Sequence, residues 1–310
     1  MNDTSSSLQI LKSLSDATAE LVGKVASSVV SVSCGMRRGS GVVWSSDGYI
    51  VTCSHIIGRN AGAKVGSEEG KSYDAKVVGY DLYSDVALLK IEGEALKPIE
   101  LGDSEKLKTG QFVLALANPF NRKPSAASGI ITNTAGSIRG FAGISMENVI
   151  VTDAQLNPGY SGGPVIDVSG KMIGLNAACA WSRGIAIPAN IVKNIVEQLM
   201  NEGKIKRAYL GIVSETILLP MEIASQAVID QNSAILVLSV EKNSAAKKAG
   251  LMLGDIIVKF DGKSVANVYD LVKLLTSEKI GEETKLTLLR EEQLIELTIT
   301  PSVAKAENDD

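Results

Sequence analysis

Apolar residues near the N-terminus recur at the spacing of an amphipathic helix. Polar residues separate the members of this set, which are Leu8, Leu11, Leu14, Leu21, Val22 and Val25. Apolar side chains at this period fall on one face of a helix. Ser15 could cap a second helical segment within the stretch. The pattern predicts an N-terminal helical segment over residues 1–26.

The period then changes to that of strands. Short runs rich in Val and Ile are separated by Gly, Asp and Ser, and they cover Ser27–Ser33, Gly41–Trp44, Tyr49–Ser54, Ala75–Tyr80, Val86–Ile91, Phe112–Ala117, Gly129–Thr132, Val149–Thr152, Val165–Asp167 and Lys171–Asn176. Such runs predict strands joined by turns. Because no helices alternate with them, a parallel sheet is excluded, and a closed barrel or a sandwich is expected.

A second domain follows this β-rich region. Apolar residues at helical spacing in Ile191–Leu199 predict a closing helix, and the polar segment Asn201–Lys204 is typical of a helix stop and linker. Further strands, one turn and two short helices are predicted at Ala234–Val240, Asp255–Phe260, Lys285–Arg290, Leu294–Thr300, Asp261–Gly262, Ala245–Ala249 and Val268–Leu275. We expect domains at residues 27–203 and 204–302, and a disordered acidic tail at residues 303–310.

Charge and hydropathy exclude two classes of partner. The 310 residues include 31 Lys and Arg against 35 Asp and Glu, a net charge of −4, so no diffuse basic field favours nucleic acid. No apolar run approaches the roughly 18 residues that cross a bilayer, and polar residues interrupt the first stretch, Met1–Asp16. We therefore expect no nucleic-acid partner, no membrane span and no signal peptide. A cytoplasmic location is predicted, or an extracytoplasmic one if the chain is truncated.

Cysteine and histidine usage narrows the chemistry. Cys34, Cys53 and Cys179 are too widely spaced for a zinc motif and too few for a disulfide scaffold, so reduced structural thiols are expected. We expect no metal and no cofactor. His55 is the single histidine, and any mechanism that needs an imidazole must use it.

The segment Asn157–Pro164 is the sharpest local motif, with three glycines around Ser161. Because glycine tolerates positive φ and has no Cβ, such a loop can aim backbone N–H groups inward while the serine hydroxyl stays reachable. That arrangement suits an acyl-transfer nucleophile. A plain glycine-rich turn would give the same string, so the motif needs support from other residues.

Chain order separates the serine hydrolase classes. The nucleophile elbow of α/β-hydrolases fits the same string, but those enzymes place histidine after serine, whereas His55 precedes Ser161. A subtilisin-like order would need an aspartate before the histidine, where the candidates are Asp3, Asp16 and Asp47. The β-rich surroundings favour neither of these two classes. The chain order that remains for the catalytic residues is histidine, then aspartate, then serine.

Two aspartates compete for the third role. Asp85 begins the apolar run Val86–Ile91, where its carboxylate could be buried against an imidazole N–H, and Asp81 is the local alternative. Aspartates are also common at turns and strand starts without any catalytic role. His55 follows the predicted strand Tyr49–Ser54, which would hold its side chain beside a cleft.

The motifs around these residues resemble those of the HtrA (Deg) family of serine proteases. The matching segments are Gly39–Val43, Asp47–His55, Ser84–Ile91, Asn118–Phe120, Thr152–Pro164 and Gly184–Pro188. The resemblance covers the chain from about Ser15 to Pro301 and implies a mostly β fold, with a chymotrypsin-like double β-barrel followed by a PDZ domain.

Specific roles follow from the resemblance. Ser161 is similar to the family nucleophile, His55 to its general base and Asp85 to the carboxylate that orients the base. The N–H groups of Gly159 and Ser161 would form the oxyanion hole. Tyr160 departs from the family, which usually has a small polar residue there, so the oxyanion loop is either permanently formed or must rearrange.

A specificity pocket is also implied. Leu156 corresponds to one wall, and Asn176, Ala177 and Ala178 should lie opposite. Because no acidic residue stands at the expected bottom of the pocket, we expect the pocket to accept small or medium aliphatic side chains of the substrate rather than Arg or Lys. The alternative is that Leu156 only packs inside the barrel.

The segment Arg207–Ile212 resembles the carboxylate-binding loop of an HtrA PDZ domain, with Tyr209, Leu210, Gly211 and Ile212 as the binding residues. A peptide C-terminus would add as a strand beside Leu210–Val213 and pack against the helix that carries Leu271 and Leu275. The alternative is a PDZ fold that serves only as a spacer.

The implied function is ATP-independent endopeptidase activity in protein quality control, on unfolded or damaged proteins. The alternative is a chaperone-like holdase or peptide-binding scaffold with weak or switched-off proteolysis. The family implies a homotrimer or a higher homo-oligomer, although residues 1–43 contain none of the aromatic residues near the N-terminus that family members often have.

Overall fold

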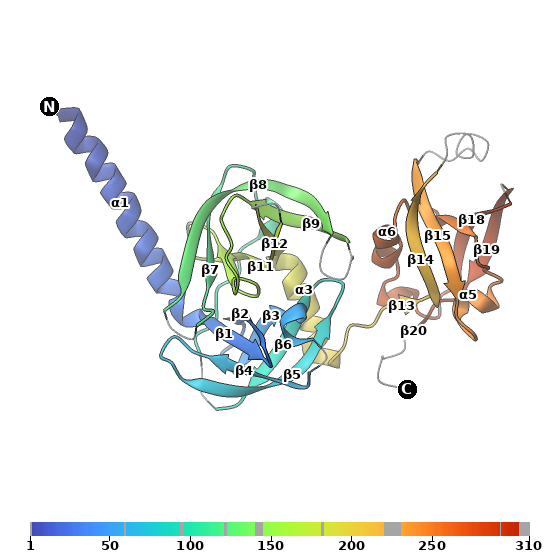
Figure 1. The fold of residues 1–310 in the computed structure, drawn as a ribbon, viewed down its shortest axis with the longest axis horizontal. Helices are drawn as coiled ribbons and strands as arrows, with labels where there is room; N and C mark the ends of the chain where they lie inside the picture. Colours follow the sequence, from blue (N-terminus) through green and yellow to red (C-terminus); the bar gives the residue numbers. More distant parts are fainter. Residues whose placement is uncertain are drawn as a thin grey trace. The chain divides into compact units, whose positions relative to one another are not determined.

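The computed structural model describes residues 2–58, 60–93, 96–120, 123–139, 145–180, 183–219, 231–291 and 293–303. The side chains of residues 2–6, 135–139, 145–148, 178–180 and 269 are outside this description. The chain divides into two compact units, Met1–Ile205 and Lys206–Asp310 (Figure 1).

The first unit begins with one long helix. Helix α1 runs without interruption over Asn2–Val25, so the predicted break at Ser15 is wrong. Its last turns are anchored, since Leu21 and Val22 pack against the core and Val25 is buried in it. The apolar side chains of its first half are more than half exposed, and they belong to Leu8, Ile10, Leu11 and Leu14.

Six antiparallel strands then close the first barrel in the order β1-β2-β3-β6-β5-β4 (Figure 1). The elements are η1 (Ala26–Ser28), β1 (Val29–Cys34), β2 (Arg37–Val43), β3 (Tyr49–Cys53), α2 (Ser54–Ile57), β4 (Gly62–Gly66), β5 (Ser72–Asp81) and β6 (Val86–Ile91). Alternate apolar residues of these strands fill the barrel with fully buried side chains, among them Val30, Ile50 and Leu88. β4 was not expected from the sequence, because Val65 is its single β-branched residue.

A second barrel closes in the order β10-β11-β12-β9-β8-β7. Its elements are β7 (Phe112–Ala117), β8 (Ser125–Arg139), β9 (Ser145–Thr152), β10 (Pro164–Ile166), β11 (Met172–Ala180) and β12 (Arg183–Pro188), preceded by η2 (Ser104–Lys106). Helix α3 (Ala189–Glu202) follows and packs on β5, β6, β11 and β12, strands of both barrels. A single core cluster contains residues from the two barrels, so they form one rigid support for the loops between them.

The second unit is a separate β structure with its own core around the fully buried Phe260. Its elements are β13 (Ala208–Tyr209), β14 (Ile212–Leu218), β15 (Ser233–Val240), α5 (Ala245–Lys248), β16 (Ile256–Phe260), β17 (Lys263–Ser264), α6 (Val268–Leu274), η4 (Ser277–Lys279), β18 (Thr284–Arg290), β19 (Gln293–Ile299) and β20 (Ser302–Val303). The main sheet has the order β14-β15-β16-β18-β19, which leaves β14 at an edge.

The C-terminal tail departs from prediction at its first residue. Val303 pairs with Ala208 in the small sheet β13-β20, so disorder from residue 303 onward is wrong at that position. Residues 304–310 lie outside the described residues. Among the described helices, none combines the length and apolar character needed to cross a bilayer.

Candidate active site

His55 and Asp85 stand at neighbouring strand ends of the first barrel. Cys53 ends β3 and pairs with Val86 at the start of β6, which places the residues that follow and precede them side by side. Nδ1 of His55 lies 2.7 Å from Oδ2 of Asp85. The other carboxylate oxygen, Oδ1, accepts the backbone N–H of His55 and the hydroxyl of Ser54, each at 2.9 Å. The carboxylate is thereby fixed against the imidazole.

The backbone of Asp85 adopts an unusual conformation. Its φ is +55°, in the left-handed region that non-glycine residues seldom occupy, and Asp and Asn tolerate it best. Its side chain is the one that reaches His55. Asp81, the local alternative, has a carboxylate that accepts the N–H of Ser84 at 3.0 Å within the turn. The geometry therefore favours Asp85 for contact with the imidazole.

Ser161 lies in a loop where the two barrels meet. Its hydroxyl donates to the carbonyl of Ala177 at 3.0 Å, and its own carbonyl accepts the N–H of Ser40 on β2 at 2.8 Å. The next residue, Gly162, donates its N–H to the carbonyl of Asn176 on β11 at 2.7 Å. Strands of both barrels thus hold the serine from two sides.

Gly39 connects this loop to the histidine segment. A Cβ at position 39 would lie 2.3 Å from Cδ1 of Ile56 and 2.9 Å from the carbonyl oxygen of Ser161. Only a glycine allows this close approach, because Ile56, the residue after His55, and the backbone of Ser161 both occupy the space that a side chain at position 39 would need. The fold therefore gathers the three predicted residues into one region.

Gly159 has the conformation and packing that the sequence predicted for a glycine. Its φ is +95°, and a Cβ there would lie 2.4 Å from Cβ of Pro119. Within the described residues, the N–H groups of Gly159 and Ser161 donate to no acceptor. The three other N–H groups of residues 159–163 donate to backbone carbonyls, and they belong to Tyr160, Gly162 and Gly163. Two donors are left for an external oxygen atom.

Leu156 is 8% exposed and lies in a small apolar cluster rather than on an open surface. The other members of the cluster are Ala115, Ala117, Ala127, Ala154 and Tyr160. A Cβ at Gly184 would lie 3.2 Å from Cγ of Leu156, so the leucine also packs across β12. This position fits Leu156 as a wall of the specificity pocket, and it also fits Leu156 as a residue that only packs inside the barrel.

The three residues predicted opposite Leu156, which are Asn176, Ala177 and Ala178, differ in their surroundings. Asn176 is buried, and its amide nitrogen donates to the carbonyls of Leu116 and Pro164 at 3.3 Å, which ties its side chain to β7 and β10. Ala177 is buried and supplies the carbonyl that accepts the serine hydroxyl. The side chain of Ala178 lies outside the described residues.

Cys53, His55 and Asp85 offer ligand atoms that all lie within 4.8 Å of one another. The thiol of Cys53 donates to the carbonyl of Asn176, and burial, followed by the charge of Asp85, raises its pKa well above the ordinary value. A metal ion binds cysteine as the thiolate, and the raised pKa disfavours the thiolate of Cys53. The metal ion would also have to break the hydrogen bond between the imidazole of His55 and the carboxylate of Asp85. The set therefore fits a hydrogen-bonded pair better than a metal centre.

The predicted carboxylate-binding loop lies between β13 and β14. The carbonyl of Leu210 accepts the N–H of Ala246, and that of Gly211 accepts the N–H of Glu241, at 2.8 and 2.9 Å. The hydroxyl of Tyr209 donates to the Glu241 carboxylate. In the described part of the chain, the N–H groups of Leu210 and Gly211 have no acceptor. Ile212 begins β14 and pairs with Val240.

Sequence reasoning missed Ser40 as part of the site. Ser40 is fully buried on β2, and its backbone and hydroxyl bond the carbonyls of Ser161 and Gly159. The available signal was a serine bracketed by Gly39 and Gly41 within a strand, since glycines in strands often mark close approach of another backbone. Its partners lie more than a hundred positions along the chain, so no local pattern could name them.

Models of two known families match the chain. The trypsin-like peptidase domain covers residues 39–175 and the PDZ domain covers residues 225–300. These matches, with the two six-stranded barrels, confirm the predicted double β-barrel followed by a PDZ domain.

Several known serine proteases are similar to this chain in sequence or in structure. The periplasmic serine endoprotease DegP of Salmonella typhimurium is 36% identical over 275 residues, which are 85% of this chain and 56% of that protein. A probable periplasmic serine endoprotease DegP-like protein of Marinomonas is 35% identical over 84% of this chain and 56% of its own length. A solved structure of the HtrA-type protease AlgW with a decapeptide has a TM-score of 0.76 at 27% identity, covering 93% of this chain and 99% of that one.

The chain belongs to the HtrA (Deg) family. This HtrA-family chain spans about half the length of the curated relatives that it matches. The relatives are named periplasmic, which points to an extracytoplasmic location, so the prediction of a cytoplasmic location is wrong. That prediction rested on the residues at the start of the chain, which carry no information on location if the sequence is a piece of a longer protein.

Proposed function

We propose that this chain is an ATP-independent serine endopeptidase that cleaves unfolded or damaged proteins. The observation that carries the proposal is the fixed contact between His55 and Asp85, in the same region as Ser161 and its two available N–H donors. The relatives are serine endoproteases by name, which supports the same chemistry.

The proposed mechanism uses only side chains and backbone of this chain. The Ser161 hydroxyl turns from the carbonyl of Ala177 toward the imidazole, and His55 takes its proton as the oxygen attacks the peptide carbonyl. Asp85 keeps the proton of the imidazole on Nδ1 and stabilises the imidazolium. The N–H groups of Gly159 and Ser161 bind the developing oxyanion, and His55 then protonates the leaving amine. A water molecule, deprotonated by His55, finally hydrolyses the acyl-Ser161 ester, and the proton returns to the serine oxygen.

The second unit is proposed to bind peptide C-termini. β14 is an edge strand, whose open side suits an added strand, and the N–H groups of Leu210 and Gly211 suit a terminal carboxylate. Leu271 on α6 and Leu275 at the end of α6 are buried in the core of this unit, and α6 contacts β14. AlgW has been solved with a decapeptide and with a tripeptide, which supports a peptide ligand.

The test of the protease is a serine substitution. Ser161→Ala should lower casein cleavage by about 10⁶-fold and abolish labelling by a fluorophosphonate. Ser72→Ala is a matched control, because Ser72 is exposed on β5 and should leave both measurements unchanged. Casein cleavage by Ser161→Ala at the wild-type rate would refute the proposal.

A holdase activity is the second candidate. The carboxylate-binding loop lies in a unit with its own core, so client binding does not require the Ser161 hydroxyl. If this candidate is correct, Ser161→Ala suppresses client aggregation as well as the wild type does. Suppression that is lost together with proteolysis would exclude it.

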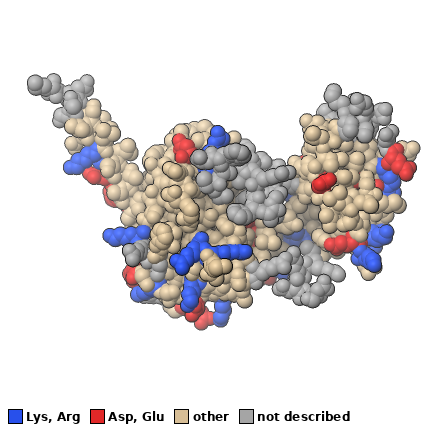
Figure 2. Space-filling view, viewed as in Figure 1, with Lys and Arg blue, Asp and Glu red and all other residues tan. Residues whose placement is uncertain are grey.

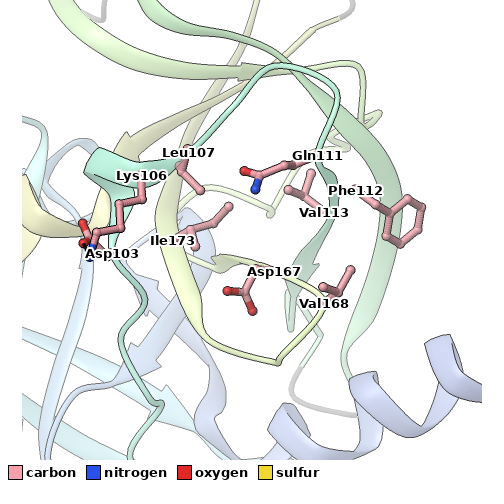
Figure 3. A pocket seen from close by; sticks show the side chains of 9 residues that line it. All are labelled: Asp103, Lys106, Leu107, Gln111, Phe112, Val113, Asp167, Val168 and Ile173. Atoms are coloured by element: carbon pink, nitrogen blue, oxygen red, sulfur yellow. Dashed lines mark ion pairs between the residues drawn. The ribbon is translucent and has the colours of Figure 1, made fainter.

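Self-association as a homotrimer or higher homo-oligomer is also proposed. The first half of α1 exposes Leu8, Ile10, Leu11 and Leu14, a large apolar stretch for an isolated helix. Beside its anchored end, at the turn where Lys24 donates to the carbonyl of Ser169, a pocket of about 320 Å³ opens on the second barrel (Figure 3). The pocket is lined by Asp103, Lys106, Leu107, Gln111, Phe112, Val113, Asp167, Val168 and Ile173.

These surfaces suit contact between copies, since the exposed leucines supply apolar area and the pocket is partly apolar. On the face drawn in Figure 2, basic side chains gather over the lower part of the first unit, and the upper part shows few charged side chains. The double variant Leu11→Asp, Leu14→Asp should convert the assembly to monomers in light scattering. A wild-type protein that is monomeric at micromolar concentration would refute self-association.

A further inference from the structure

Tyr160 is buried in an apolar cluster that consists mostly of alanines. It lies between the two proposed oxyanion donors, Gly159 and Ser161, yet its own side chain is 5% exposed. Its ring belongs to an apolar cluster of which the other members are Ala115, Ala117, Ala127, Ala154 and Leu156. The alanines come from β7, β8 and the segment after β9, and they leave room that an aromatic ring fills.

Ser40 holds the same loop through hydrogen bonds. The Ser40 hydroxyl donates to the carbonyl of Gly159 at 2.7 Å and accepts the N–H of Asn118 at 2.8 Å. Its backbone N–H donates to the carbonyl of Ser161 at 2.8 Å. One buried residue of the first barrel therefore bonds the carbonyls on both sides of Tyr160.

Contacts within the loop complete the restraint. The N–H of Tyr160 donates to the carbonyl of Asn157 at 3.1 Å, and its carbonyl accepts the N–H of Gly163 at 3.0 Å. Every peptide carbonyl from Gly159 to Ser161 therefore has a donor, while the N–H groups of Gly159 and Ser161 donate to nothing in the described residues. Rotating these peptides would require the ring to leave its apolar cluster or the Ser40 bonds to break.

We propose that Tyr160 and Ser40 are positioning residues, which keep the oxyanion loop at residues 157–163 formed before substrate binds. The inference rests on the proposed function, and it answers how a loop with a bulky residue at this position stays ordered. Neither side chain touches the reacting atoms. The ring fixes the loop by burial, and the hydroxyl fixes the direction of the Gly159 carbonyl.

A purely structural role predicts a different result. If Tyr160 only fills the core, its loss lowers the melting temperature, and each folded molecule keeps its turnover rate. If the residues position the donors, kcat falls and KM changes little, because the lost interaction is made in the transition state. Labelling of Ser161 by a fluorophosphonate, which also forms a tetrahedral centre, slows in parallel.

The experiment compares four variants of the full chain. Tyr160→Ala removes the ring, and Tyr160→Phe keeps the ring and removes only a hydroxyl that bonds no described residue. Ser40→Ala removes the bond to Gly159 and keeps the backbone N–H. Ser67→Ala is the matched control, because Ser67 is 6% exposed and its hydroxyl has no partner in the described residues.

We expect Tyr160→Ala and Ser40→Ala each to lower kcat by about 10²-fold, the effect of losing one oxyanion donor, with KM within about threefold. Tyr160→Phe and Ser67→Ala should stay within about twofold of the wild type in kcat. A folded Ser40→Ala with wild-type kcat overturns the proposal, and so does a folded Tyr160→Ala with wild-type kcat. If Tyr160→Ala does not fold, Ser40→Ala alone decides.

The result is separable from the test of the protease itself. If Ser161→Ala keeps wild-type turnover, the proposed function has failed and the loop has no oxyanion to bind. If Ser161→Ala is inactive and either folded positioning variant keeps full kcat, only the inference about Tyr160 and Ser40 has failed.

Discussion

The imidazole of His55 and the carboxylate of Asp85 are joined across two strand ends by a contact of 2.7 Å. Both carboxylate oxygens have partners, because the one that does not face the ring is held by the His55 N–H and the Ser54 hydroxyl. A carboxylate restrained in this way can orient only one tautomer of the ring, with the proton on Nδ1. In the proposed mechanism, Nε2 is then the ring atom that acts on the serine.

Replacing Asp85 by asparagine should separate catalysis from folding. Asparagine tolerates the φ of +55°, so the Asp85→Asn protein should fold, while it loses the acceptor that fixes the tautomer. We expect kcat to fall by about 10⁴-fold. Asp81→Asn is the control, since Asp81 is the neighbouring buried aspartate and its carboxylate accepts the N–H of Ser84 within the turn. Equal activity of the two variants would assign the role elsewhere.

The buried thiol of Cys53 should make stability depend on alkaline pH. Burial raises its pKa well above 9.0 in the folded chain, whereas the unfolded chain ionises near that value. The unfolded state then binds fewer protons above about pH 9, so stability is complete below this pH and falls as the pH rises. Between pH 8 and pH 10 the melting temperature of the wild type should fall more steeply than that of Cys53→Ser. If the melting temperatures of the wild type and of Cys53→Ser fall equally between pH 8 and pH 10, the buried thiol is not the cause.

Gly211 should be required for peptide binding by the second unit. Its φ is +81°, and a Cβ there would lie 2.2 Å from Cβ of Ser244. Gly211→Ala should therefore distort the carboxylate-binding loop and weaken a C-terminal peptide by at least about 10-fold in a titration. Gly262→Ala is a matched control, because Gly262 has a φ of +72° with no atom within 4 Å of a Cβ. Similar losses in both variants would indicate backbone strain alone.

The pair Asp255 and Arg290 should stabilise the second unit. Asp255 is 2% exposed, and the guanidinium contacts its two oxygens at 2.7 and 2.8 Å. Arg290→Met leaves a buried carboxylate unpaired, which should cost about 3 kcal/mol of unfolding free energy. Lys285→Met breaks the exposed pair with Glu296 and should change the unfolding free energy far less, because solvent screens this pair.

Urea unfolding of the full chain measures both variants. Trp44 and Trp181, the two tryptophans, lie in residues 1–205, so their fluorescence follows the first unit, and far-ultraviolet circular dichroism adds the second. The transition seen only by circular dichroism should move for Arg290→Met. Equal shifts for Arg290→Met and Lys285→Met would mean that burial of Asp255 carries no special cost.

Much of the fold was predictable from local patterns. β6 and β7 have the predicted bounds, because β7 is an uninterrupted apolar run and only Lys90 interrupts the apolar run of β6. β4 and β14 were missed, since glycines and a lysine dilute the first, and serine, glutamate and threonine dilute the second. Their pairing is decided by neighbouring strands rather than by intrinsic preference.

The candidate site shows the same division. His55, Asp85 and Ser161 could be named from motifs, because each lies in a distinctive local segment. The contacts of Ser40 with the Ser161 loop, and the alanines around Tyr160, depend on how the barrels close and dock. Long-range packing of this kind leaves no trace in a short stretch of sequence, so only the structure reveals it.

The pairing of β20 with β13 joins the two ends of the second unit. Ala208 and Tyr209 open the unit, and Ser302 and Val303 return beside them. A module whose entry and exit points are neighbours can be inserted into a loop of another protein, or circularly permuted, with little strain on its host. The second unit, residues 206–310, therefore has the chain geometry of a module that can be moved between proteins as one piece.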